Sequence, residues 1–401
     1  MCMFAKKNKK MKCFDQFKSL ERMINMKKNN DISNRKSNIE LLRIIAMIMI
    51  IAHHYCLYGG WSKVSGLSIN NAILDFLVIG GKIGVAIFVL ISGYFGINSE
   101  FKIKKLINTV LQVLFYSILF GLLNIIIDGW AGWKAFIKIC LPITFSVYWF
   151  ITVYCILYLI SPYINKVIKI LNKKEFIKLL LIMGILSCGV ITTILKPNRG
   201  FGSLFIFVFL YILGAYINTY YNGKHIKYSL LISIFFYFLI FASQLLFETF
   251  IPNYVNYFID LTSLPIIACA IFMLLGFKEL DVESKVINTI SSATFGVYLI
   301  HENTYVRPFI WQKVFKNYLF YSKSTLFLHA IICIIITMII CTRIELMRKR
   351  YIEKNTTPIV YKMFNILIIK SKNIVNKIKE EKNENIFCNR RSWIYWLKLS
   401  K

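Results

Sequence analysis

The chain has 401 residues, of which 57% are hydrophobic, and its mean hydropathy is +0.60. A soluble globular protein cannot hide so much apolar surface, so the composition excludes that class and favours a protein of the lipid bilayer. The 49 lysines and arginines outnumber the 19 acidic residues and leave a net charge of +30. Because cations gather at the cytoplasmic ends of membrane spans, this charge does not indicate a nucleic-acid partner.

Apolar windows of about 19 residues predict ten transmembrane helices along the chain. In order, they are 39–58, 76–98, 106–127, 141–160, 177–195, 202–220, 228–247, 258–277, 287–304 and 324–342. A segment of about 20 apolar residues matches a hydrocarbon core about 30 Å thick. We therefore predict an all-α integral membrane fold built as a bundle of about ten transmembrane helices.

The charges between these spans predict their orientation. The clear clusters of lysine and arginine lie at 102–105, 166–178 and 348–350, all on one side of the ten-span arrangement. Cationic loops mark the cytoplasmic side. Since ten is an even number, both termini are predicted to be cytoplasmic.

Three segments are predicted on this basis. Residues 1–37 form a basic cytoplasmic tail, 38–346 the transmembrane domain, and 347–401 a second basic cytoplasmic tail. The second tail is interpreted as an amphipathic helix at the membrane surface or as a disordered basic segment. The ten cysteines form no CxxC pair, so neither a metal site nor a disulfide framework is predicted.

The first span contains side chains that are costly in lipid and therefore suggest function. Arg43 and His54 are eleven residues apart, which is about three helical turns plus about 20°, so they share one face at an axial separation of about 16 Å. His53 points about 80° away from the direction of Arg43. We predict that Arg43, near the cytoplasmic end, and His54, in the outer third of the membrane, face one shared cavity.

Plainer explanations exist for several of these residues. Arg43 is close enough to the inner headgroups to snorkel to them, and His53 is interpreted as a packing residue. Glu40 stands three residues after Ser37, the spacing of a helix-capping box. Gly80 and Gly84 have the small-residue spacing that lets two helices approach closely.

An arginine, ten residues and a histidine in a first span resemble the signature of the acyltransferase 3 family of integral-membrane enzymes. Three later segments are similar to further motifs of that family, in the same order: GKIGVAIFVLISGY at 81–94, YWFIT at 148–152 and GVYLIHEN at 296–303. The resemblance extends over about residues 36–346.

The resemblance implies acyl-CoA, usually acetyl-CoA, as the donor and a hydroxyl of a cell-envelope polysaccharide, or of its lipid-linked precursor, as the acceptor. It implies donor contacts from Arg43, Lys102 and Lys105, while Asn108 stands where another cation is expected. An arginine fork suits the phosphates of CoA.

A neutral imidazole at His54 would take the proton of the acceptor hydroxyl, a form of help that contributes about 10²–10⁴-fold. Alternatively, His54 would carry the acyl group covalently. The sequence leaves both routes open.

The end of the ninth predicted span supplies the remaining candidates. Glu302 is the first candidate for a carboxylate that fixes the tautomer of His54 and stabilises its cation, with Asp260 and Glu248 as alternatives. His301, Asn303 and Arg307 are predicted to line the acceptor side. Interfacial anchoring explains His301 equally well.

The favoured hypothesis is thus an O-acetyltransferase of the bacterial plasma membrane that contacts lipid, a CoA thioester and an envelope glycan. The alternative is a non-enzymatic polytopic carrier of a polysaccharide intermediate or small solute, for which the sequence shows no inverted repeat of interrupted spans. A catalytically dead scaffold is a third possibility.

The predicted topology is testable with a reporter fused after Gln312. Because this residue follows the ninth predicted span, we expect the reporter to be external, whereas a control fusion after Lys174 should be cytoplasmic. A cytoplasmic signal at Gln312 would contradict the count of spans that precede it.

Overall fold

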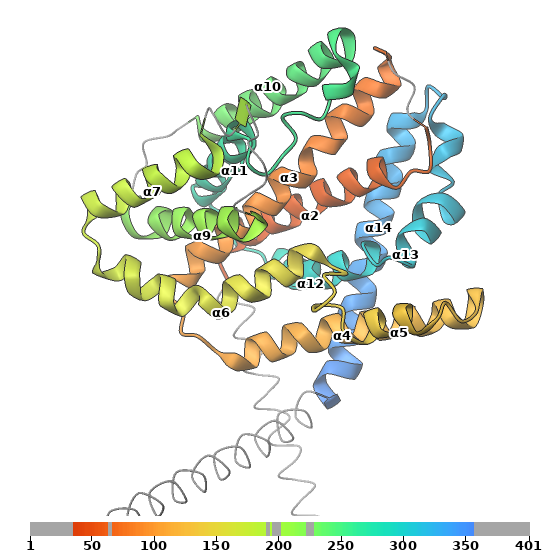
Figure 1. Ribbon diagram of the computed structural model, residues 1–401, viewed down its shortest axis with the longest axis horizontal. Helices are drawn as coiled ribbons and strands as arrows, with labels where there is room; N and C mark the ends of the chain where they lie inside the picture. Colours follow the sequence, from red (N-terminus) through yellow and green to blue (C-terminus); the bar gives the residue numbers. More distant parts are fainter. Residues whose placement is uncertain (1–34, 63–65, 190–192, 195–201, 222–227, 357–401) are drawn as a thin grey trace, which may run out of the picture. The chain divides into compact units, whose positions relative to one another are not determined.

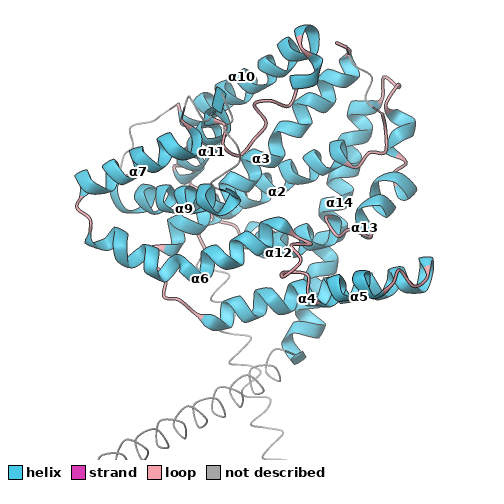
Figure 2. Cartoon of the chain, viewed as in Figure 1, coloured by secondary structure: helices cyan, strands magenta, loops and turns pink. Residues whose placement is uncertain are grey.

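The computed structural model describes residues 35–62, 66–189, 193–194, 202–221 and 228–356. These residues form helices and loops without a strand (Figure 2), so the predicted all-α membrane fold is confirmed. The predicted tails fall largely on 1–34 and 357–401, which lie outside the described residues. Contacts divide the chain into one unit that ends at Glu345 and a second that begins at Leu346.

The principal helices follow the chain order of Figure 1. They are α2 (Ser37–Leu57), α3 (Ile69–Gly96), α4 (Ile103–Asp128), α5 (Trp133–Cys140), α6 (Trp149–Ile170), α7 (Lys173–Cys188), α9 (Gly202–Tyr220), α10 (Ser229–Phe250), α11 (Leu264–Lys278), α12 (Lys285–His301) and α14 (Leu326–Arg348). Shorter helical turns are Pro252–Tyr254, α13 (Val306–Pro308), Phe309–Val314, Asn317–Phe320 and Lys349–Glu353. In the second unit, Arg348 Nη2 lies 2.8 Å from Glu353 Oε2.

Each of the ten predicted spans coincides at least in part with one of these helices. Seven helices of the described residues are long and apolar enough to cross a membrane, which makes the chain a multi-pass membrane protein. The helices α7, α11 and α12 have 16, 15 and 17 residues and fall short of the usual length of a full crossing. The count of ten spans and the cytoplasmic termini therefore stay predictions.

The largest shift between prediction and structure concerns the fourth span, predicted at 141–160 and observed as α6. The chain turns at Pro142 and enters the helix only at Trp149. Within α6, Pro162 cannot donate a hydrogen bond to the carbonyl of Tyr158. The Ser161 hydroxyl donates to that carbonyl instead, at 2.8 Å, so the helix continues to Ile170 across the proline.

Helices α2 and α3 form the centre of the first unit, with α9, α11 and α12 packed beside them (Figure 1). Glycines permit the closest approaches. A Cβ atom added at Gly84 would lie 2.6 Å from the carbonyl oxygen of Ala46, and one at Gly214 would lie 2.1 Å from that of Leu90. Backbones in contact at these points confirm the predicted role of Gly84 in helix packing.

The substitution Gly214→Ala tests the packing of α9 on α3. Its methyl group would overlap the backbone of α3, and we expect a loss of about 1–3 kcal/mol in stability, measured as a lower melting temperature in detergent or nanodiscs. The matched control is Gly184→Ala, whose Cβ would meet the Phe209 ring at an ordinary 3.4 Å. Equal melting temperatures for the two variants would contradict the close approach.

Candidate active site

Two groups of polar side chains lie at opposite ends of α2. Arg43 belongs to the first, at the end where α2 begins, α3 ends, α4 begins and α6 ends. This is the end that the charge pattern assigns to the cytoplasm. His54 belongs to the second, where α2 and α12 end. The rise of the helix separates the two residues by about 16 Å along its axis.

The Arg43 end opens into a cavity of about 820 Å³. Five cationic side chains and a single carboxylate, Glu100, line it; the cations are Arg43, Lys102, Lys105, Lys166 and Lys169. The sequence-predicted donor residues Arg43, Lys102 and Lys105 thus meet in one place. Lys166 and Lys169 of α6 were predicted only to mark the cytoplasmic side. They reach this cavity because α6 packs beside the start of α4.

Neighbouring residues fix the walls of this cavity. The Tyr158 hydroxyl contacts both the backbone nitrogen and the carbonyl oxygen of Lys102 at 3.2 Å, which ties the start of α4 to α6. Asn165 donates to the carbonyl of Gly96 at 2.9 Å and accepts from the Tyr211 hydroxyl at 3.1 Å. These bonds join α6 to α3 and α9, so the cations are carried by helices held in place.

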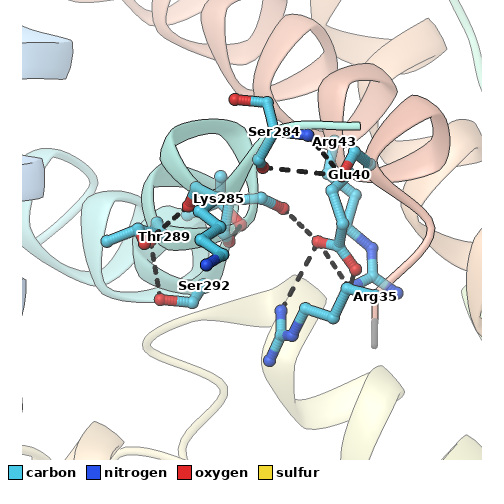
Figure 3. A network of polar contacts seen from close by, with 10 residues as sticks. Arg35, Glu40, Arg43, Ser284, Lys285, Thr289 and Ser292 are labelled. Atoms are coloured by element: carbon cyan, nitrogen blue, oxygen red, sulfur yellow. Dashed lines mark hydrogen bonds and ion pairs between the residues drawn. The ribbon is translucent and has the colours of Figure 1, made fainter. Parts of the chain in front are cut away.

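Glu40 holds the Arg43 guanidinium at the edge of this cavity. Arg43 Nη1 lies 3.2 and 3.4 Å from the two carboxylate oxygens of Glu40, and Arg35 Nη1 lies 3.5 Å from Oε2 (Figure 3). The Ser291 hydroxyl of α12 donates to the same carboxylate. The guanidinium carbon of Arg43 also lies 5.6 Å from the centre of the Phe95 ring.

The capping box predicted for Glu40 is wrong. Ser37 lies inside α2 rather than before it, and the backbone N–H of Glu40 donates to the carbonyl of Lys36. The buried Glu40 side chain turns instead toward the two arginines and α12. A carboxylate between two guanidiniums keeps its charge compensated and leaves Arg43 partly exposed to the cavity.

The second group surrounds His54. His54 Nδ1 lies 2.9 Å from His301 Nε2, and His54 Nε2 lies 3.3 Å from Glu302 Oε2. His301 Nδ1 lies 2.6 Å from the carbonyl oxygen of Val297, one turn earlier in α12. The structure thus brings three sequence-predicted residues, His54, His301 and Glu302, into direct contact.

Glu302 is held on its other side by Tyr58 and Arg307. Its Oε1 accepts hydrogen bonds of 3.0 Å from both the Tyr58 hydroxyl and Arg307 Nη1. Arg307 also donates to the Tyr58 hydroxyl at 2.6 Å and covers its ring. Oε2, the oxygen next to His54, is buried and lacks an aligned hydrogen-bond partner among the described residues. Tyr58 was missed in the sequence, although it follows His54 by one helical turn and so shares its face.

The predicted acceptor-side residues separate into two kinds. His301 is fully buried with both ring nitrogens engaged, and Asn303 is buried with its amide donating to the Tyr148 hydroxyl at 2.7 Å. Both residues bond to other parts of the protein in this structure, and their substrate contacts stay predictions. Arg307 keeps more than a quarter of its side chain exposed.

The remaining candidates lie elsewhere. Asp260 accepts from the backbone and the hydroxyl of Thr262, and Glu248 accepts from Gly66 and Asn71. His53 is turned toward α3, with its Nδ1 at 2.6 Å from the carbonyl oxygen of Val78. Among the candidate carboxylates of the described residues, Glu302 is the one beside His54.

The cavity described above does not reach His54, because its lining includes Arg43 and not His54, and a cavity shared by the two residues stays a prediction. A series of aromatic contacts leads from this cavity to His54. Tyr154, on the cavity wall, stacks with Phe150 at 6.0 Å between ring centres; Phe150 contacts Tyr298 at 5.7 Å; and Tyr298 lies 6.5 Å from His54. The helix spacing that placed both residues on one face carried no information about the rings between them.

Comparison with known proteins identifies a family for this chain. Residues 36–345 match the family model described as an acyltransferase domain, which covers most of the chain and coincides with the helical region described above. No curated protein and no solved structure matches the chain.

Proposed function

Because this chain belongs to the acyltransferase 3 family, we propose that it is an O-acetyltransferase that uses acetyl-CoA and modifies a hydroxyl of a cell-envelope polysaccharide or of its lipid-linked precursor. The bacterial plasma membrane is the proposed location. The observation that carries the proposal is the arrangement along α2, with a cationic cavity at one end and a histidine–glutamate contact at the other. Family membership favours this enzyme over a non-enzymatic carrier.

The cationic cavity suits the donor. CoA carries a diphosphate and a further phosphate, and lysine and arginine side chains bind such groups through charge-assisted hydrogen bonds. Five cations against one carboxylate leave the cavity with a strong positive balance. We assign the phosphates of acetyl-CoA to this cavity, with Arg43 at its edge.

The histidine–glutamate contact suits the transfer step. The acceptor hydroxyl oxygen attacks the thioester carbonyl carbon while its proton passes to His54 Nε2. The carbon–sulfur bond then breaks, and the same proton returns to the CoA thiolate, so that an acetyl ester and free CoA are formed. Glu302, 3.3 Å from Nε2, stabilises the imidazolium that exists between these events.

The donor has to pass the aromatic contacts to reach His54. Its phosphates would lie at the Arg43 end, and its pantetheine arm would bridge the axial interval of about 16 Å. The contacts of Tyr154, Phe150 and Tyr298 lead from the cavity wall toward His54. The Tyr298 hydroxyl is buried without a hydrogen-bond partner among the described residues, and a donor of this kind suits the oxygen of the acyl carbonyl.

The variant His54→Ala tests the catalytic assignment. In membranes supplied with labelled acetyl-CoA, we expect it to lose transfer by at least about 10²-fold, because the base is removed, while expression stays unchanged. The matched control is His53→Ala, since His53 faces the backbone of α3, and it should keep most of the activity. The reverse pattern would show that the wrong histidine has been assigned.

The donor site is tested by charge removal. We expect Arg43→Ala, and the double variant Lys166→Gln with Lys169→Gln, to raise the KM for acetyl-CoA about tenfold or more with a smaller effect on kcat, because each lost charged contact weakens donor binding. The matched control is Lys134→Gln with Lys138→Gln, which removes the same charge from α5. An unchanged KM in the α6 double variant would place the donor outside this cavity.

A further inference from the structure

His301 is a second imidazole that the transfer step described above does not use. It is fully buried, and its Nε2 meets His54 Nδ1 at 2.9 Å. Its Nδ1 meets the carbonyl oxygen of Val297 at 2.6 Å. The two histidines come from α2 and α12, which pack against each other.

These two contacts determine where the protons lie. A carbonyl oxygen only accepts hydrogen bonds, so His301 Nδ1 carries a proton and donates it to Val297. In the neutral His301 ring, Nε2 then holds the lone pair and is an acceptor. His54 Nδ1 is therefore the donor of the 2.9 Å bond. A neutral His54 with a proton on Nδ1 holds its own lone pair on Nε2.

From this chain of hydrogen bonds we infer that His301 is a positioning residue: it fixes the tautomer of His54 so that Nε2 is the basic nitrogen. The inference rests on the proposed function, in which His54 is the base. The sequence-based expectation gave this task to Glu302, but Glu302 lies beside Nε2, the opposite nitrogen. His301 and Glu302, which are adjacent in the chain, therefore have different roles toward His54.

The division has a direct chemical consequence. His301 accepts from Nδ1 in both protonation states of His54, so the ring orientation does not change when the proton arrives. The proton arrives at Nε2, where Glu302 Oε2 is buried without an aligned partner. The neutral ring thus offers a lone pair to the acceptor hydroxyl, and the protonated ring gains a nearby carboxylate.

Three substitutions of His301 separate this role from simple packing. His301→Gln keeps an acceptor close to the place of the imidazole Nε2, whereas His301→Asn reaches only as far as Nδ1, and His301→Leu has no acceptor. For Asn and Leu we expect kcat to fall about 10²-fold or more, with the KM for acetyl-CoA changed by less than about threefold. His301→Gln should retain activity within about tenfold of the wild type.

The tautomer itself can be measured without any turnover. The chain has five histidines, so nitrogen-15 NMR of histidine-labelled protein in nanodiscs, with His54→Ala to assign the signal, resolves the state of His54. We expect a protonated Nδ1 and an unprotonated Nε2 in the wild type and in His301→Gln. In His301→Asn and His301→Leu we expect a mixture of the two tautomers.

Two results would overturn the inference. The first is a wild-type spectrum in which Nε2 rather than Nδ1 of neutral His54 carries the proton. This test uses the wild-type protein, so it does not depend on whether the His301 variants fold. The second is full kcat in His301→Leu. Failure of the proposed function looks different, because wild-type protein would then transfer no acetyl group while its His54 tautomer stayed as expected.

Discussion

The attachment of α2 to α12 by polar contacts at both ends is the constraint on which this structure depends. At one end Ser291 of α12 donates to Glu40, and at the other His301 accepts from His54. In an apolar bundle an unpaired polar group costs several kcal/mol, so each of these contacts has one favourable arrangement. Two such contacts, separated by most of the length of α2, fix both its position along α12 and its rotation.

That attachment explains how one helix serves two chemically different regions. Glu40 directs Arg43 toward the cationic cavity, and the contact of His54 with α12 holds its ring beside Glu302. The glycine contacts of α3 with α2 and of α9 with α3 bring these backbones close together and hold α2 in the centre of the unit. The packing of small residues and the pairing of polar residues therefore support the same geometry.

Much of the fold follows from the sequence because apolar length and charge clusters are local signals. Each predicted span overlaps a helix, and the error at the fourth span comes from Pro142, which delays α6 to Trp149. The place of Arg43 and His54 on a single helix followed in the same way, from spacing alone. The contact between His54 and His301 could not be predicted from spacing. It joins residues 247 positions apart and depends on the rotation of α12 about its axis.

The roles of Glu40 and His301 show where local rules reach their limit. The spacing of Ser37 and Glu40 is that of a capping box, but the Glu40 carboxylate instead contacts Ser291 of α12 and the nearby Arg35 and Arg43. His301 and Glu302 are adjacent in sequence, and yet they meet opposite nitrogens of one imidazole. Only the distances between helices distinguish the residue that fixes the tautomer from the residue that stabilises the charge.

Under the proposed function, the separation of the cationic cavity from His54 would protect the donor. A thioester held beside a general base is open to attack by water, and excluding water from the reacting groups suppresses that loss. The rings of Tyr154, Phe150 and Tyr298 make a series of contacts that leads from the cavity wall to His54. A donor anchored by its phosphates at Arg43, as proposed, would meet the base only after its arm displaces these rings, which would couple donor binding to the exposure of His54.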